Sequence, residues 1–205
     1  MEVTSAPRGR NRRGQGERLR EDIVSAALRM LDELGDDQAL SLRAVAREVG
    51  IAATSVYLHF TDRDALVLAA MERWHREMVR AIDEAEAGAP DPAAALRARI
   101  LVLGACVREH PGLYKVLHES TLNQRASMAF KQQLADRTTA AVQRCMDAGL
   151  APPGDATAVA LDLRAAAHGA VSMRINEPGL PWPPLEEQVD RFLSKLVGVH
   201  DKTGR

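Results

Sequence analysis

Residues 41–60, SLRAVAREVGIAATSVYLHF, constrain the fold of this chain more than any other segment. The first half of the segment repeats apolar side chains at the three- and four-residue spacing of one helix face, at Leu42, Val45, Ala46 and Val49. Ser41 stands at an N-cap position, and Gly50 can adopt the left-handed conformation that ends a helix. A second short helix is expected from about Ala53. This pattern is typical of a helix-turn-helix, whose second helix enters the major groove of DNA.

The same segment and the residues after it carry a family resemblance. The stretch is VAREVGIAATSVYLHFTDRDALV, and its defining positions are Val45-Ala46, Gly50-Ile51, Ala53 to Ser55, Tyr57-Leu58-His59-Phe60, Arg63 and Leu66. This pattern is similar to the DNA-binding signature of the tetracycline-repressor (TetR) family of bacterial transcription regulators. The family usually has Lys where this chain has Arg63, and Arg keeps the positive charge. The resemblance implies a DNA-binding head followed by a body that binds a ligand and dimerises.

Composition and helical periodicity predict an all-α fold. The 205 residues are 46% apolar and only 3% aromatic, so we expect an aliphatic core in one large or two small domains. We predict a flexible basic arm over residues 1–16, a three-helix head over 17–62 and a six-helix body over 63–205, about nine helices in all. Apart from the helix-turn-helix pair, the predicted helices cover residues 17–34, 63–86, 91–110, 113–120, 123–148, 155–175 and 185–199.

The chain has a net charge of −1, so any basic surface for DNA must be local. The N-terminal segment supplies one, with Glu17 as its one acid among the arginines Arg8, Arg10, Arg12, Arg13, Arg18 and Arg20. We expect Arg12 and Arg13 to contact DNA phosphates or the minor groove. The alternative is a solvated, disordered tail, which the glycines of this segment also favour.

The helix-turn-helix predicts most of the DNA contacts. The expected residues are Arg43, Ala53, Thr54, Ser55, Tyr57, Leu58, His59 and Arg63. Hydroxyl groups can bond to phosphates or base edges, and small apolar groups can contact a thymine methyl. The second helix has no Arg, Asn or Gln, so Arg43 is the candidate for reading a guanine. Tyr57, His59 and Arg63 are better suited to phosphate contacts, although packing inside the head is an alternative for Tyr57 and His59.

One head of this size covers half of a typical site, so we expect a homodimer that reads a palindromic operator in double-stranded DNA. The small residues of helix 155–175 and the apolar stripe of helix 185–199 suggest the interface, with contacts from Ala166, Ala170, Val189, Phe192, Leu193 and Leu196. Two such helix pairs would form a four-helix bundle. The alternative is that these residues close the core of the single chain.

The resemblance also implies a pocket in the body for a small-molecule effector. Its expected lining is Met78, Leu103, Val107, Tyr114, Leu117, His118, Arg164 and His168. His118 and Arg164 interrupt apolar stretches, and an inward Arg164 would suit an anion such as a carboxylate. A hydrogen-bonded His118 and a surface Arg164 are the alternatives. Ligand binding would shift helix 63–86 and separate the heads from their half-sites.

Two stretches of the body, HPGLYKVLHES and LRAAAHGAVSM, look like a TetR subgroup whose C-terminal domain carries a Trp-x-x-x-His-Gly pattern. His168-Gly169 matches this pattern, but Arg164 occupies the Trp position.

We predict no catalytic site, cofactor or metal centre. His118-Glu119 begins like a zinc-protease helix, but Leu122 stands where the second His is required. Ser120 lies near His118 without the Gly-x-Ser-x-Gly turn of a hydrolase. An enzyme is therefore disfavoured, and the remaining alternative is a helical protein-interaction module with a vestigial DNA-binding head.

The sequence predicts a cytoplasmic protein with no membrane span. No apolar run reaches the roughly 18 residues that a transmembrane helix needs, and the Arg-rich N-terminus lacks the apolar region of a signal peptide. Cys106 and Cys145 do not suggest a disulfide framework.

Overall fold

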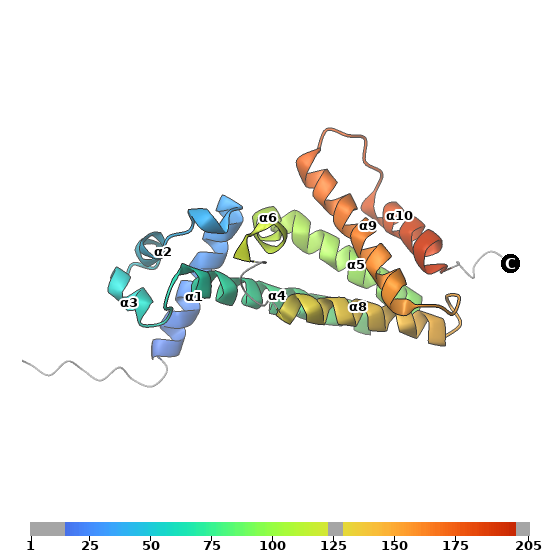
Figure 1. Ribbon diagram of the computed structural model, residues 1–205, viewed down its shortest axis with the longest axis horizontal. Coiled ribbons are helices and arrows are strands. Elements are labelled where there is room, and N and C mark those ends of the chain that lie inside the picture. The colour runs from blue at the N-terminus through green and yellow to red at the C-terminus, as the bar shows by residue number, and fades with distance from the viewer. Residues whose placement is uncertain (1–14, 123–128, 200–205) are drawn as a thin grey trace, which may run out of the picture.

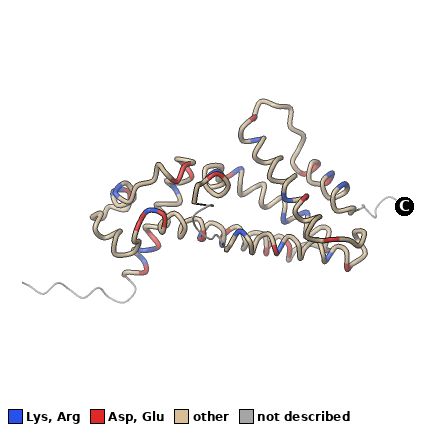
Figure 2. Tube along the Cα trace, in the orientation of Figure 1, with Lys and Arg blue, Asp and Glu red and all other residues tan. Residues whose placement is uncertain are grey.

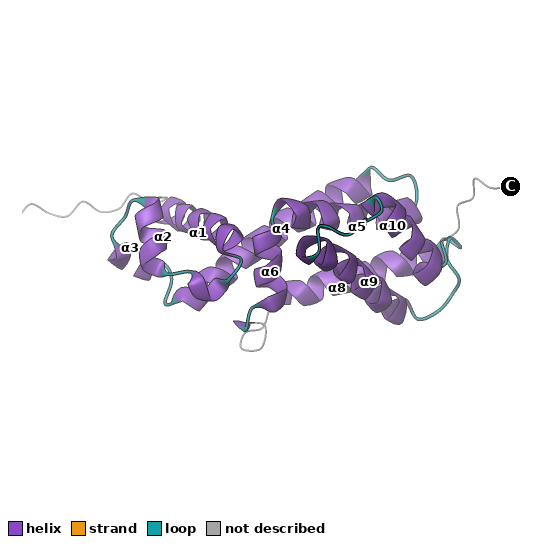
Figure 3. Cartoon of the chain, turned by 90° about the horizontal axis from the view of Figure 1, so that it is seen from above, coloured by secondary structure: helices purple, strands orange, loops and turns teal. Residues whose placement is uncertain are grey.

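The computed structural model describes residues 15–122 and 129–199. Within these residues it contains nine α-helices and no strand, which confirms the predicted all-α fold. The molecule is elongated, with α1, α2 and α3 at one end and α4 running from that end along the body (Figure 1). Helix α6 lies between the head and the remaining body helices in both views (Figures 1 and 3).

The head forms as the local signals predict. Its elements are α1 (Gln15–Leu34), the 3-10 turn η1 (Asp37–Ala39), α2 (Leu42–Val49) and α3 (Ala53–Tyr57). Ser41 Oγ accepts the N–H of Ala44 at 3.1 Å, and Gly50 ends α2 with a φ of 75°. Helix α3 is only one turn and a half, and Val56 on its inner face is fully buried against the head core.

Three of the body helices begin at an aspartate cap. The body helices are α4 (Arg63–Ala87), α5 (Pro92–Glu109), α6 (Pro111–Glu119), α8 (Ala129–Asp147), α9 (Ala156–Asn176) and α10 (Leu185–Phe192). The carboxylates of Asp62, Asp91 and Asp155 accept first-turn N–H groups of α4, α5 and α9. The last predicted helix is shorter than expected, because α10 passes into a π-helical turn (Leu193–Val197) that Gly198 ends with a φ of 77°. The start of the helix predicted over 123–148 lies outside the described residues.

Two apolar clusters hold the fold together. The first joins the head to the beginning of α4 and to α6, and includes Ile23, Leu31, Val45, Val56, Leu66, Trp74, Leu113 and Leu117. The second joins α5, α8, α9 and α10 through Leu96, Val142, Leu163, Val189 and Leu193. The first cluster crosses the position 62/63, where the sequence places the end of the head. The division into head and body therefore stays a prediction, and α6 packs as part of the head core while it belongs to the body in sequence.

Candidate nucleic-acid interface and ligand cavity

Helix α3 exposes the side chains that the sequence assigns to DNA. Leu58 is 85% exposed and Tyr57 is 55% exposed, so Tyr57 is not packed inside the head. Thr54 is also exposed, whereas Ala53, Ser55 and His59 are half-buried. Helix α3 lies at the end of the molecule remote from α9 and α10 (Figure 1). Its outward face is therefore open to a large partner such as a DNA duplex.

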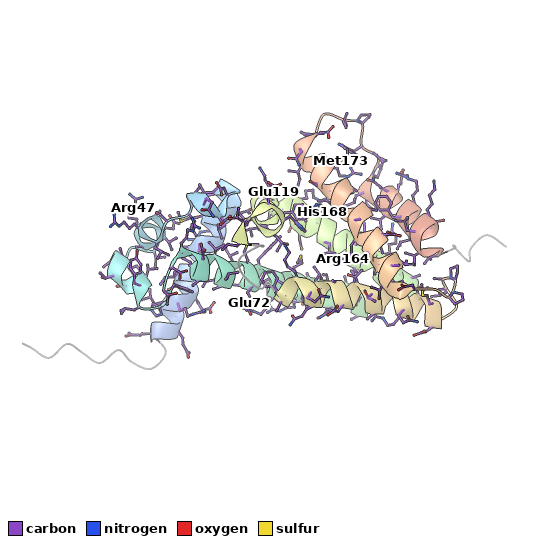
Figure 4. All side chains as sticks on the ribbon, viewed as in Figure 1. Arg47, Glu72, Glu119, Arg164, His168 and Met173 are labelled. Carbon is purple, nitrogen blue, oxygen red and sulfur yellow. The ribbon has the colours of Figure 1, made fainter. Side chains whose placement is uncertain are left out.

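Positive charge flanks α3 and is absent from it. No charged residue lies in α3, and basic residues lie on the neighbouring α2 (Figure 2). Arg43 at the start of α2 is exposed, and Arg47 extends away from the body (Figure 4). Arg20 of α1 places its guanidinium 5.0 Å from the ring centroid of Phe60. Arg12 and Arg13, like the rest of the basic arm before α1, lie outside the described residues.

Arg63 is engaged inside the head. Its Nε and Nη2 donate to Asp64 Oδ1 at 3.1 and 2.7 Å, and its Nη1 donates to Gln38 Oε1 at 2.9 Å. These bonds tie the start of α4 to η1. The side chain is 27% exposed, so a phosphate contact by Arg63 stays a prediction that requires sharing the guanidinium with Asp64.

The body contains a cavity of about 380 Å³ between α4, α5, α6, α8, α9 and α10. All the residues expected at the ligand site line this one cavity, from Met78 on α4 to His168 on α9. The sequence analysis did not assign Trp74, Ile100, Gly104, Leu134, Leu161, Ala165, Ala167, Val171 and Leu185, which also line it. Several of these residues lie on predicted apolar stripes, and periodicity does not separate a cavity wall from a filled core.

The polar side chains of the cavity come together where α6 meets α9. The hydroxyl of Tyr114 is hydrogen-bonded to Nδ1 of His168. The ring of His118 lies 4.5 Å from the Tyr114 ring and 4.4 Å from the His168 ring, measured between centroids. Arg164 and His168 are one helical turn apart on α9, on its side toward the cavity (Figure 4). Three aromatic rings and one guanidinium thus form a single polar group in an otherwise apolar wall.

The surroundings of this group hold Tyr114 and His118 in their neutral forms. Burial raises the pKa of Tyr114 to about 12. Removal of the His118 ring from bulk water, followed by the nearby charges of His168, Lys131 and Arg164, lowers the pKa of His118 to about 3. His118 lines the cavity and is itself exposed in the single chain. Desolvation disfavours the charged form of each group, so it raises the pKa of the acid Tyr114 and lowers the pKa of the base His118.

The residues expected at a dimer interface require a correction. Val189 is 1% exposed, Leu193 is 5% exposed and Ala170 is 6% exposed, so the single chain already covers them. Phe192 is half-buried and lines the cavity together with Val189 and Ala170. The stripe of α10 faces α5 and α9, because three- and four-residue spacing identifies an apolar face without identifying what covers it. Of the six expected residues, Leu196 is the exposed one, at 37%, and Ala166 is half-buried.

Comparison with known proteins gives a family. Residues 23–70 match the model of bacterial regulatory proteins of the tetR family, and residues 105–199 match the tetracyclin repressor-like C-terminal domain. These matches span the helix-turn-helix and most of the cavity-bearing body. The chain belongs to the TetR family of bacterial transcriptional regulators.

Individual relatives agree with this assignment. An uncharacterized HTH-type transcriptional regulator of Haemophilus influenzae is 50% identical over 54 residues, which span 26% of each protein. A protein of unknown function from Rhodococcus sp. RHA1 has the same fold, with a TM-score of 0.75 and 27% identity over 87% of this chain and 95% of that one. A TetR-family regulator from Agrobacterium tumefaciens matches with a TM-score of 0.64 and 26% identity over 80% of this TetR-family chain and 90% of its own.

The described part of this TetR-family protein offers neither a clustered metal site nor a membrane-spanning helix. Residues 15–122 and 129–199 contain no group of three or more His, Cys, Asp or Glu side chains placed to hold a metal ion. No helix within the same residues combines the length and apolar character needed to cross a bilayer.

Proposed function

We propose that this TetR-family protein is a cytoplasmic homodimeric repressor that binds a palindromic operator and releases it when a small molecule enters the cavity of its body. The observation that carries the proposal is the exposed face of α3, with Tyr57 and Leu58 projecting from a head that matches the family. A regulatory role, rather than catalysis, accords with a cavity that shares helices with a head of this family.

The face of α3 suits contact with a duplex. Its outward side chains are small or uncharged, so the helix can approach base edges closely, and Leu58 can contact a thymine methyl. Tyr57 can donate its hydroxyl proton to a phosphate, which sets the register of the head on the duplex. Arg43 at the start of α2 supplies the guanidinium that α3 lacks and can bind the acceptors of a guanine.

The dimer interface that we propose uses the outer faces of α9 and α10. The large apolar side chains exposed in this region are Leu161, Met173, Leu180 and Leu196, at 37 to 55%. Clusters of exposed apolar side chains on a soluble protein mark interaction surfaces. A stable dimer should bury above about 2,000 Å² here. We expect Met173→Glu to give monomers in analytical ultracentrifugation, whereas Leu34→Glu, at an exposed leucine on α1, should leave the dimer intact.

The cavity and the head share two helices, through which an effector can act. Met78 and Trp74 of α4 line the cavity, and α4 begins at the head. Tyr114 and Leu117 of α6 line it as well, and both belong to the apolar cluster of the head. A ligand that binds better to one arrangement of these helices shifts the population of heads that fit the operator.

Selection of bound duplexes from a random DNA pool at two salt concentrations tests the proposal. We expect one palindromic site, with affinity that falls steeply as salt rises. Arg43→Ala should cost about 1–3 kcal/mol and relax specificity at one guanine, while Arg80→Ala on exposed α4 surface should leave selection unchanged. Weak, sequence-blind binding would favour the alternative of an interaction module with a vestigial head.

A further inference from the structure

The polar group of the cavity indicates the chemistry of the effector. We infer that the effector is a small aliphatic carboxylate, whose carboxylate group binds Arg164 and whose chain lies along the apolar wall of the cavity. This inference rests on the proposed function only in taking the cavity to be the effector site, and direct binding measurements test it without DNA.

The lining of the cavity carries a positive charge that no acidic side chain of the lining balances. The lining contains no Asp or Glu, and Arg164 is its one permanently charged side chain. No hydrogen bond or ion pair to Arg164 occurs among the described residues, although the guanidinium is half-buried. A guanidinium beside apolar surface favours a paired anion, and a carboxylate can accept two parallel hydrogen bonds from it.

Three arginines on the neighbouring helices differ from Arg164 in this respect. Arg97 contacts Asp190 at 2.6 Å, and Arg99 contacts Glu86 at 2.6 Å. Arg137 pairs with Asp83. In each case two helices of the body supply the cation and the anion. At Arg164 the residues that the structure describes supply the cation alone, so the matching anion is expected from a molecule in the cavity.

Polar side chains of α6 and α9 add hydrogen-bonding groups to the same part of the cavity as Arg164. Tyr114 keeps its proton, since burial raises its pKa to about 12, and its hydroxyl is hydrogen-bonded to Nδ1 of His168. That hydrogen bond occupies Nδ1 of His168, so the other ring nitrogen, Nε2, is the one that can bond to a ligand. His118 is neutral and adds one more donor. The permanent charge of Arg164 beside the uncharged side chains of Tyr114 and His118 can bind the carboxylate of a ligand.

The rest of the cavity has an apolar wall that can hold an aliphatic chain. Away from the polar group the lining is mostly aliphatic, with Leu103, Val107, Leu134, Leu161 and Val171. A volume of about 380 Å³ lies within the range of small-molecule sites. A ligand with one anionic end and an aliphatic chain satisfies both parts of the cavity. Each methylene group removed from water should tighten binding about fourfold until the wall is filled.

Isothermal titration calorimetry of the full chain with hexanoate, octanoate and decanoate tests this inference, with octanol and octylamine as probes of equal chain length. We expect the best carboxylate to bind at least about tenfold more tightly than octanol, and octylamine to bind more weakly than octanol. Arg164→Gln should lower carboxylate affinity about tenfold or more and leave octanol affinity unchanged. Arg191→Gln, at an exposed arginine of α10, should change neither.

Three results would overturn the inference. They are equal binding of octanoate and octanol, an unchanged octanoate affinity in Arg164→Gln, and no binding by any of the carboxylates. Circular dichroism of Arg164→Gln verifies that the variant is folded, and its retained octanol binding shows that the cavity is intact. If an operator is selected but no carboxylate binds, the proposed regulatory function stands and the proposed class of effector is rejected. If a carboxylate binds but no operator is selected, the class of ligand stands and the proposed regulatory function is rejected.

Discussion

The carboxylate of Asp32, near the end of α1, lies 2.7 Å from Nδ1 of His110, directly before α6. Its other oxygen accepts the backbone N–H groups of Gly112 and Leu113 at 3.0 and 3.2 Å. A head residue therefore caps the helix that carries Tyr114, Leu117 and His118 into the cavity. Through Asp32, the position of α6 and the position of the head are connected by hydrogen bonds as well as by apolar packing.

Replacing Asp32 should weaken this connection. Asp32→Ala leaves the first N–H groups of α6 without their acceptor, and we expect the free energy of unfolding to fall by about 1–2 kcal/mol. Urea denaturation measures it. Asp36→Ala is the matched control, because Asp36 caps η1 through the N–H of Gln38 and belongs to the head alone. In operator titrations with octanoate, the coupling lost in Asp32→Ala should be about 0.5–2 kcal/mol larger than in the control.

The same contact makes Gly112 sensitive to any side chain. A Cβ at Gly112 would lie 1.8 Å from the carbonyl oxygen of Asp32, so α1 and α6 would have to move apart. We expect Gly112→Ala to lower the melting temperature by several degrees, consistent with an overpacking cost of about 1–3 kcal/mol. Gly16→Ala, where nothing lies within 4 Å, is the control. Equal melting temperatures of the two variants would show that α1 and α6 are not in close contact.

The ion pair of Glu86 with Arg99 should be costly to break. The Arg99 side chain is 1% exposed and its Nε donates to Glu86 Oε1 at 2.6 Å, joining α4 to α5. Glu86→Gln leaves a buried guanidinium without its anion, and we expect a loss of about 3–5 kcal/mol of unfolding free energy. Glu84→Gln, on the exposed surface of the same helix, should change it by less than about 0.5 kcal/mol. Similar losses in both variants would contradict this account.

His75 should make the fold sensitive to acid. Burial, and then the charge of Arg137 on α8, lower the pKa of His75 below 6.5, with Arg76 acting in the same direction and Glu72 against it. The unfolded chain protonates this ring as the pH falls through about 6.5, while the folded chain resists, so the free energy of unfolding falls toward low pH. Above about pH 6.5 the ring is uncharged in both states, so His75 no longer lowers the free energy of unfolding.

His75→Leu should reduce this loss, by up to about 1.4 kcal/mol for each pH unit below about 6.5. Guanidinium titrations of the variant and the original chain at about pH 7 and pH 5 measure the difference, in which other titrating groups cancel. Parallel stability curves for the two proteins would show that His75 takes up a proton equally well in both states.

The sequence alone predicts those helix ends whose capping residues lie within a few positions of the groups that they cap. Ser41 and Gly50 mark helix ends that the structure reproduces, because a cap acts on N–H or C=O groups within four residues of it. Helical spacing and the family resemblance together also identified side chains that line one cavity, including Tyr114 on α6 and His168 on α9.

How those elements cover one another depends on contacts between segments that are distant in the sequence. Helical spacing alone predicts that Val189 and Leu193 lie in a dimer interface. In the structure both residues are buried in the core of the single chain, and Val189 also lines the cavity. The link from Asp32 to the start of α6 joins residues about eighty positions apart, and neither sequence neighbourhood signals it. Local signals act over a few residues, whereas the partner of an apolar face or a carboxylate depends on which distant segment the packing brings beside it.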